Sequence, residues 1–203
     1  MPDALPIDRT LIIACGALAQ EILAIIDANG LQHLDLTCLP AGLHNHPEKI
    51  PAAVSAAIAA GRKTNRKIFV AYADCGTGGL LDRVLEAEDV RRLPGAHCYA
   101  FYSGVDAVAR RGDADMRAFF LTDFLVRQFD ALVIEGLGLD RYPELRDSYF
   151  QHYEKVVYLA QTHAPDLRAA AELAAQKLKL AFEYRFVGFG DLATGIATAG
   201  ENI

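Results

Sequence analysis

Short apolar runs alternate along the chain with longer segments in which apolar residues recur every three or four positions. A continuous apolar run of about four to eight residues is typical of a buried strand, and the longer spacing is typical of an amphipathic helix. The clearest strand is 67–73, and the glycine-rich segment 74–79 forms a turn into the next helix. The other predicted strands are 11–15, 34–39, 96–102, 131–135, 155–160 and 184–189, and the predicted helices are 16–29, 48–60, 80–90, 103–112, 115–129, 143–153 and 165–182, with a glycine-containing tail after the last strand.

This alternation predicts the α/β class. Strands that are separated by helices pair in parallel, and right-handed crossovers distribute the helices over the sheet. We expect a Rossmann-like, open, mainly parallel sheet with helices on both faces. No internal repeat, low-complexity tract or break in composition marks a linker, so residues 1–203 are expected to form a single α/β domain.

The composition excludes several classes of protein. Hydrophobic residues make up 52% of the chain and charged residues 23%, which is enough apolar surface for a substantial core. The net charge is −6, and no stripe of Lys or Arg is interleaved with aromatic residues, so nucleic acid is not an expected partner. No apolar stretch approaches the length of a membrane span, and residues 1–9 do not resemble a signal peptide. We therefore expect a cytoplasmic protein whose thiols stay reduced.

Three of the four cysteines lie where a predicted strand passes into a loop or helix, namely Cys15, Cys75 and Cys98. The carboxyl ends of strands in an open α/β sheet are where such folds bind ligands. Three thiolates and one open position suit a catalytic zinc ion, and His44 or His97 could add a nitrogen ligand. The alternative is that these cysteines pack as small apolar residues, as Cys38 is expected to do within its apolar strand.

Two further features could belong to the same site. The loop residues Gly76, Thr77, Gly78 and Gly79 precede a helix, so their N–H groups could bind a cofactor; a tight strand-to-helix turn explains them equally well. The loop matches neither the Walker A motif nor the Rossmann fingerprint. His44 and His46 share a loop after a strand, where a histidine can bind metal or carry a proton.

Taken as a set, these motifs resemble a bacterial and archaeal family of unknown function that is often encoded beside corrinoid-dependent methylamine and betaine methyltransferases. In that family an early strand ends in Cys, and the following helix carries Glu, as Cys15 and Glu21 do here. The other matching elements are Leu43-His44-Asn45-His46-Pro47, Tyr72-Ala73-Asp74-Cys75-Gly76-Thr77-Gly78 and Leu93-Pro94-Gly95-Ala96-His97-Cys98-Tyr99 with Ser103-Gly104, over roughly residues 10–160. The resemblance favours a shared site at Cys15, His44, Cys75 and Cys98.

The residues indicate a zinc ion, and the resemblance implies one-carbon metabolism as the setting. Zinc removes the proton from a bound thiol, so we expect a small-molecule substrate and methyl transfer, with His44 and His97 as candidate catalytic residues and a corrinoid protein as a possible partner. Two alternatives stay open. One is a non-catalytic accessory protein with a structural metal, and the other is a metal-free thiol enzyme with Cys75 as nucleophile. A homo-oligomer is compatible with the sequence.

Overall fold

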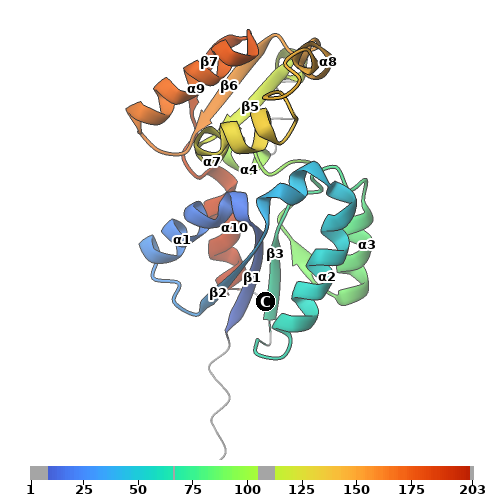
Figure 1. Cartoon of the computed structure of the whole chain (residues 1–203). Coiled ribbons are helices and arrows are strands. Elements are labelled where there is room, and N and C mark those ends of the chain that lie inside the picture. The colour runs from blue at the N-terminus through green and yellow to red at the C-terminus, as the bar shows by residue number, and fades with distance from the viewer. Residues whose placement is uncertain (1–8, 66, 105–112, 202–203) are drawn as a thin grey trace, which may run out of the picture. The chain divides into compact units, whose positions relative to one another are not determined.

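The computed structural model describes residues 9–65, 67–104 and 113–201. These residues fall into two compact units (Figure 1). The first unit contains the chain up to Cys98 together with the segment from Asp191 onward, and the second contains Tyr99–Gly190. Each unit has its own parallel sheet, so the α/β class is confirmed, with two all-parallel sheets in place of one.

The first sheet has the strand order β2-β1-β3-β4. Its central strands are apolar and buried, and Ile12, Ile13 and Val70 have no exposed surface. All pairs are parallel; Cys15 lies opposite Leu39, and Ala14 opposite Ala71. The carboxyl ends of the strands therefore share one edge of the sheet. The strands are β1 (Thr10–Cys15), β2 (Leu34–Leu39), β3 (Lys67–Ala71) and β4 (Arg91–Arg92).

Helices cover both faces of this sheet, as predicted. Figure 1 shows α2 and α3 on one face and α1 and α10 on the other. Gly61 at the end of α2 lets this helix approach the sheet closely, because a Cβ atom there would lie 2.3 Å from Leu11 Cδ2. The helical segments are Gly16–Leu18, α1 (Ala19–Ala28), Ala41–Asn45, Pro47–Lys49, α2 (Ile50–Gly61), α3 (Leu80–Glu88) and α10 (Gly190–Glu201).

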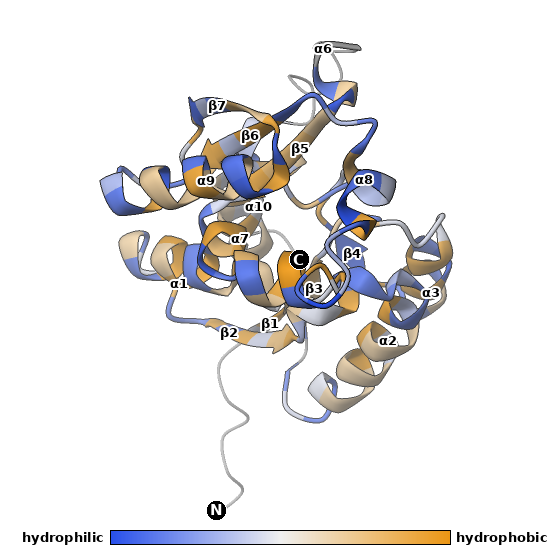
Figure 2. Ribbon diagram, turned by 45° about the horizontal axis from the view of Figure 1, so that its top comes forward, coloured by the Kyte–Doolittle hydropathy of each residue, from blue (hydrophilic) through white to orange (hydrophobic). Residues whose placement is uncertain are grey.

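The second sheet has the order β5-β6-β7, again all parallel. Its middle strand is buried from Val156 to Ala160 and packs in a core with α7 and α9. Figure 2 shows mostly apolar colour along β5 and β6, whereas helices such as α9 carry both colours. The elements are α4 (Ala100–Ser103), α6 (Asp113–Met116), β5 (Ala118–Thr122), α7 (Asp123–Arg127), a π-helix (Asp130–Glu135), α8 (Leu145–Phe150), β6 (Lys155–Ala160), α9 (Pro165–Leu178) and β7 (Ala181–Phe186).

One strand of the first sheet lies elsewhere than predicted. Residues 96–102 are not a strand; the fourth strand is Arg91–Arg92, and the helix α4 begins at Ala100. Beyond β4 the Leu93 N–H still donates to the Val70 carbonyl, and the carbonyls of Gly95 and Ala96 accept from the N–H groups of Asp74 and Cys75. The segment after Pro94 therefore binds the loop that follows β3.

Other expectations fail in the second unit. Part of the expected helix 115–129 is strand β5, because its apolar and aromatic residues pair with β6. The segment 131–135 is part of a π-helix and not a strand, since a short apolar run fits either state. The glycine-containing tail, which from Asp191 onward belongs to the first unit, forms the helix α10. Helix α9 stops earlier than expected because Lys179 adopts a left-handed conformation, and β7 begins correspondingly earlier. The predicted helix 103–112 falls largely outside the described residues.

Candidate functional site

Three buried thiols gather at the carboxyl edge of the first sheet. Cys15 is the last residue of β1, Cys75 follows β3, and Cys98 follows β4. Their exposed fractions are 1%, 5% and 6%, and none of the three forms a disulfide. Buried thiols at this edge lie where a parallel α/β sheet places ligands.

Backbone hydrogen bonds join the loops that carry two of these thiols. The N–H groups of Asp74 and Cys75 donate to the carbonyl oxygens of Gly95 and Ala96, over 3.0 and 2.8 Å. The Sγ atoms of Cys75 and Cys98 consequently lie 3.1 Å apart. This separation exceeds the about 2.05 Å of a disulfide and is below the roughly 3.8 Å between two thiolates on a tetrahedral zinc ion. The pair is a hydrogen-bonded dithiol.

The two thiols of this pair differ in acidity. The hydrogen bond from Cys98 lowers the pKa of the Cys75 thiol, against the opposing effect of burial. The same bond, together with burial, raises the pKa of Cys98 well above its ordinary value. Cys75 is therefore the member of the pair that ionises first, with Cys98 as the donor that stabilises its thiolate.

Tyr72 connects the third thiol to this pair. Its hydroxyl is fully buried and comes close to the Cys15 thiol, yet nothing in the described part of the chain completes an ordinary hydrogen bond with it. Burial raises the pKa of Tyr72, and interactions with the Cys15 thiol and then with Cys98 and Cys75 raise it further. Burial also raises the pKa of Cys15, while contacts with Ala17 and Tyr72 oppose that effect. All three thiols thus act on one buried hydroxyl.

The glycine-rich loop is hydrogen-bonded to the side chain of Asp74, its own first residue. The Asp74 carboxylate accepts hydrogen bonds from the Thr77 hydroxyl (2.6 Å) and from the N–H groups of Gly78 (3.2 Å) and Gly79 (2.8 Å). These bonds lower the pKa of Asp74. Cofactor binding by Gly76, Thr77, Gly78 and Gly79 stays a prediction, and it would compete with Asp74 for two of the N–H groups.

The backbone of this loop is sharply turned. Cys75 has a φ of 49°, and Gly76, Gly78 and Gly79 also have positive φ values. A residue with a side chain rarely adopts this conformation, and such backbone strain tends to occur at functional positions. The loop therefore holds the Cys75 thiol in place at a cost in backbone energy.

Two histidines lie at the rim of the thiol cluster. His44 and His97 have exposed side chains and are close enough to interact electrostatically. The pKa of His44 is lowered, mainly because neighbouring atoms displace water from its ring and secondly because of the charge of His97. The His44 side chain is exposed, so solvent weakens both effects. Pro47 packs against Gly76, so the loop after β2 contacts the loop after β3. His46 instead faces Glu48 at 3.6 Å, on the surface.

The donor set suits zinc, although the sulfur atoms are not arranged around a metal. Within the described ranges, no group of three or more His, Cys, Asp or Glu side chains has metal-binding geometry. Cys75 and Cys98 would have to separate by roughly 0.7 Å to bind one zinc ion together. Three thiols with imidazoles at the rim are the ligands that zinc prefers, so a zinc site at these residues stays a prediction.

Cys38 differs from the other cysteines. Its expected place in the core is wrong, because β2 is an edge strand and the Cys38 side chain is exposed. It therefore offers a thiol for comparison with the buried ones.

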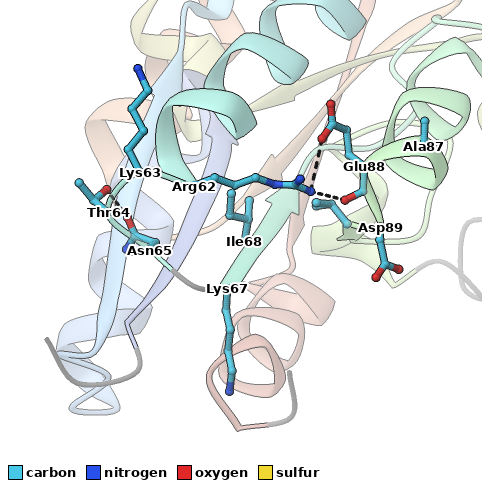
Figure 3. Close-up of a pocket in the computed structure, with 10 residues that line it drawn as sticks. Arg62, Lys63, Thr64, Asn65, Lys67, Ile68, Ala87, Glu88 and Asp89 are labelled. Carbon is cyan, nitrogen blue, oxygen red and sulfur yellow. Dashed lines mark hydrogen bonds and ion pairs between the residues drawn. The ribbon is translucent and has the colours of Figure 1, made fainter. Parts of the chain in front are cut away.

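A polar cleft lies at the opposite, amino-terminal end of β3 (Figure 3). It has a volume of about 760 Å³. Arg62 crosses it to bind the carbonyl and the carboxylate of Glu88, while Lys63 and Lys67 point away from each other. Arg62 and Glu88 pair within the cleft, and the described residues that line it include no cysteine.

Sequence reasoning did not identify the role of Asp74. The spacing of Asp74 and Thr77 around a glycine-rich turn is typical of a carboxylate that closes its own loop, and this signal could have predicted the bonds. The burial of the Tyr72 hydroxyl among the thiols had no comparable signal, because it depends on how separate loops pack.

None of the helices in the described part of the chain is long and apolar enough to cross a membrane. Searches of curated proteins and of solved structures gave no match. A family model described as "Protein of unknown function (DUF1638)" matches residues 38–196. The match includes His44, Cys75, His97 and Cys98 and begins after Cys15. Because it spans more than half of the sequence, the chain belongs to the DUF1638 family.

Proposed function

We propose that this protein binds one zinc ion through Cys15, Cys75 and Cys98 and uses it in thiol-directed methyl transfer. The observation that carries the proposal is that three buried thiols lie at the carboxyl edge of one parallel sheet, with the Cys75 and Cys98 sulfur atoms 3.1 Å apart. Cysteines that only fill an apolar core have no reason to collect at this edge. A bound zinc ion supplies a Lewis acid that deprotonates a coordinated thiol substrate.

The chain's own residues would prepare the site for this chemistry. The thiols come from β1 and from two loops that are hydrogen-bonded to each other, so the backbone that carries them is held together before a metal binds. His44 arrives on an exposed loop and would be the fourth ligand or face the open position. His97 lies beside His44 and could exchange a proton with a substrate at the rim.

The methyl donor is inferred from the family resemblance. A family encoded beside corrinoid-dependent methyltransferases would use a methylated corrinoid protein or a methylamine as the source of the methyl group. The partner would then be a corrinoid protein, and the acceptor a small thiol. The exposed rim around His44 and His97 is the part of the site that such a partner could reach.

Metal analysis tests the proposal. The full chain, purified without a histidine tag under reducing conditions and incubated with zinc, should hold about one zinc ion per chain. The variants C15S, C75S and C98S should each lose it, and the matched variant C38S should keep it, because Cys38 is exposed on an edge strand. Wild-type protein without stoichiometric zinc after this treatment would overturn the proposal.

A metal-free thiol enzyme is the second candidate. The lowered pKa of Cys75 and its strained backbone favour it, because both are properties of a nucleophilic cysteine. Alkylation of zinc-free protein by iodoacetamide at several pH values distinguishes the candidates. This function requires fast modification at Cys75 at a pH where Cys15 and Cys98 do not react.

A further inference from the structure

We infer that Cys75 and Cys98 are the site of a reversible disulfide that a peroxide forms, and that this reaction controls metal binding at the thiol cluster. The disulfide itself needs only the two thiols. Its effect on metal binding rests on the proposed zinc centre.

The geometry favours this pair over other pairs of cysteines. The sulfur atoms of Cys75 and Cys98 lie 3.1 Å apart. Among the described cysteines, this is the pair whose sulfur atoms are in hydrogen-bond contact. The bond from Cys75 N–H to Ala96 and the bond from Asp74 N–H to Gly95 fix the two loops side by side. Closing the disulfide requires the sulfur atoms to approach by roughly 1 Å.

The burial of the pair points to a small oxidant. Cys75 and Cys98 are 5% and 6% exposed, so a peptide disulfide or another bulky disulfide cannot readily reach either sulfur. Hydrogen peroxide is close to water in size, so burial excludes it less than any bulky disulfide. Cys38 is exposed and would react with both classes of oxidant, which makes it an internal comparison.

The reaction balances with a peroxide as the oxidant. The Cys75 thiolate attacks one peroxide oxygen; an S–O bond forms, the O–O bond breaks, and the leaving hydroxide takes a proton to become water. The Cys98 sulfur then attacks the Cys75 sulfenic acid, so that the S–S bond forms and the S–O bond breaks. The proton from Cys98 leaves with the hydroxide as a second water. Two thiols have lost two electrons, and the peroxide has gained them.

Metal binding and oxidation require opposite movements of the same two atoms. A zinc ion would hold the sulfur atoms roughly 3.8 Å apart, whereas the disulfide holds them at about 2.05 Å. The observed 3.1 Å lies between the two. Oxidation would remove two of the three proposed thiolate ligands and leave only Cys15, so the metal would be released.

Peptide mapping of the zinc-free, reduced full chain tests the disulfide. Arg83, Arg91 and Arg92 lie between Cys75 and Cys98, so trypsin places the two cysteines in different peptides, while Cys15 and Cys38 share a third. After treatment with hydrogen peroxide and alkylation of the remaining thiols, we expect a cross-linked peptide pair that is about 2 Da lighter than the sum of the two free peptides. Dithiothreitol should restore both free peptides.

Serine variants of the four cysteines test whether the cross-link joins Cys75 to Cys98. C38S and C15S should form the cross-link as the wild type does, and C75S and C98S should not form it. Oxidised glutathione should modify Cys38 and leave the buried pair alkylatable. A wild-type map in which Cys75 and Cys98 remain free, or are joined to the peptide that carries Cys15 and Cys38, would overturn the inference without reliance on a variant that fails to fold.

A second arm separates this inference from the proposed function. Zinc-loaded protein is treated with hydrogen peroxide, and the released zinc is measured with a chromogenic chelator while the cross-link is mapped. Release in step with the cross-link supports both proposals. Protein that binds zinc but forms no cross-link overturns the inference alone, and a chain that forms the cross-link but never binds zinc overturns the proposed function alone.

Discussion

The Asp74 carboxylate accepts the backbone N–H of Gly79 over 2.8 Å and so closes the loop that carries Cys75. A second oxygen of the same carboxylate accepts from Gly78, and the Thr77 hydroxyl donates to the first. The loop therefore reaches its turned conformation with its polar backbone groups already bonded. The position of the Cys75 thiol depends on this one side chain as much as on the strand before it.

The first prediction concerns the pH dependence of this loop. The pKa of Asp74 is lower in the folded chain than in the unfolded chain, so its bonds stabilise the fold fully above the unfolded pKa of about 4 and lose effect as the pH falls through the folded value. Asp74→Asn should lower the free energy of unfolding by about 1 kcal/mol near neutral pH. Urea unfolding at several pH values should show this difference vanishing in acid. A difference that persists in acid would contradict the role given to the charge.

The second prediction concerns Cys38. Its side chain is exposed on an edge strand, so Cys38→Ser removes no buried contact. The free energy of unfolding should change by at most about 0.5 kcal/mol, as is usual for a surface substitution. The zinc content of the protein should also stay unchanged. A large loss of stability would mean that Cys38 is covered in solution, for example by a second copy of the chain.

The sequence predicted the thiol cluster through a general property of parallel sheets. Strands that run in one direction bring their carboxyl ends to one edge, so Cys15 and Cys75 were expected to lie together. Cys98 lies there too, but for a different reason. The expected strand 96–102 does not exist, and hydrogen bonds from the loop after β3 hold residues 95–96 in place. Pairings of this kind between loops have no periodic signal in the sequence.

The same limit explains the errors in the fold. The strands 34–39 and 155–160 were placed correctly to the residue. The segment 118–122 is apolar, but charged residues on either side fit a helix equally well. Its pairing with β6 determines its state, and that contact is formed across more than thirty residues of chain.

The third prediction concerns a buried carboxylate in the second unit. Asp123 is 1% exposed and accepts hydrogen bonds from the Tyr158 hydroxyl (2.8 Å) and from the N–H groups of Gln161 (2.9 Å) and Thr162 (3.1 Å). Asp123→Asn replaces one carboxylate oxygen, which accepts hydrogen bonds, by an amide NH2 group, which donates them. This NH2 group would face the donor groups of Tyr158, Gln161 and Thr162. The free energy of unfolding should fall by about 2–4 kcal/mol in urea denaturation.

Asp130→Asn is the matched control for this change. Asp130 is exposed and pairs with Lys177 on the surface, so the same substitution there should cost at most about 0.5 kcal/mol. Equal losses in the two variants would show that the network around Asp123 does not anchor the second unit.

The last prediction tests the surroundings of the Tyr72 hydroxyl. Both Tyr72 and Tyr158 are fully buried, but the Tyr158 hydroxyl donates to Asp123, whereas that of Tyr72 has no ordinary hydrogen bond within the described part of the chain. Removing a bonded hydroxyl leaves its partner unsatisfied, and removing an unbonded one relieves a desolvation cost. In the reduced, zinc-free protein, Tyr158→Phe should therefore lower the free energy of unfolding by about 1–3 kcal/mol, and Tyr72→Phe should change it by less than about 1 kcal/mol or raise it. Urea unfolding of the two variants beside the wild type makes the comparison. If Tyr72→Phe lowers the free energy of unfolding as much as Tyr158→Phe does, the Tyr72 hydroxyl is already hydrogen-bonded to a thiol in the zinc-free protein. That hydroxyl would then have no free hydrogen-bonding position for a ligand at the thiol cluster.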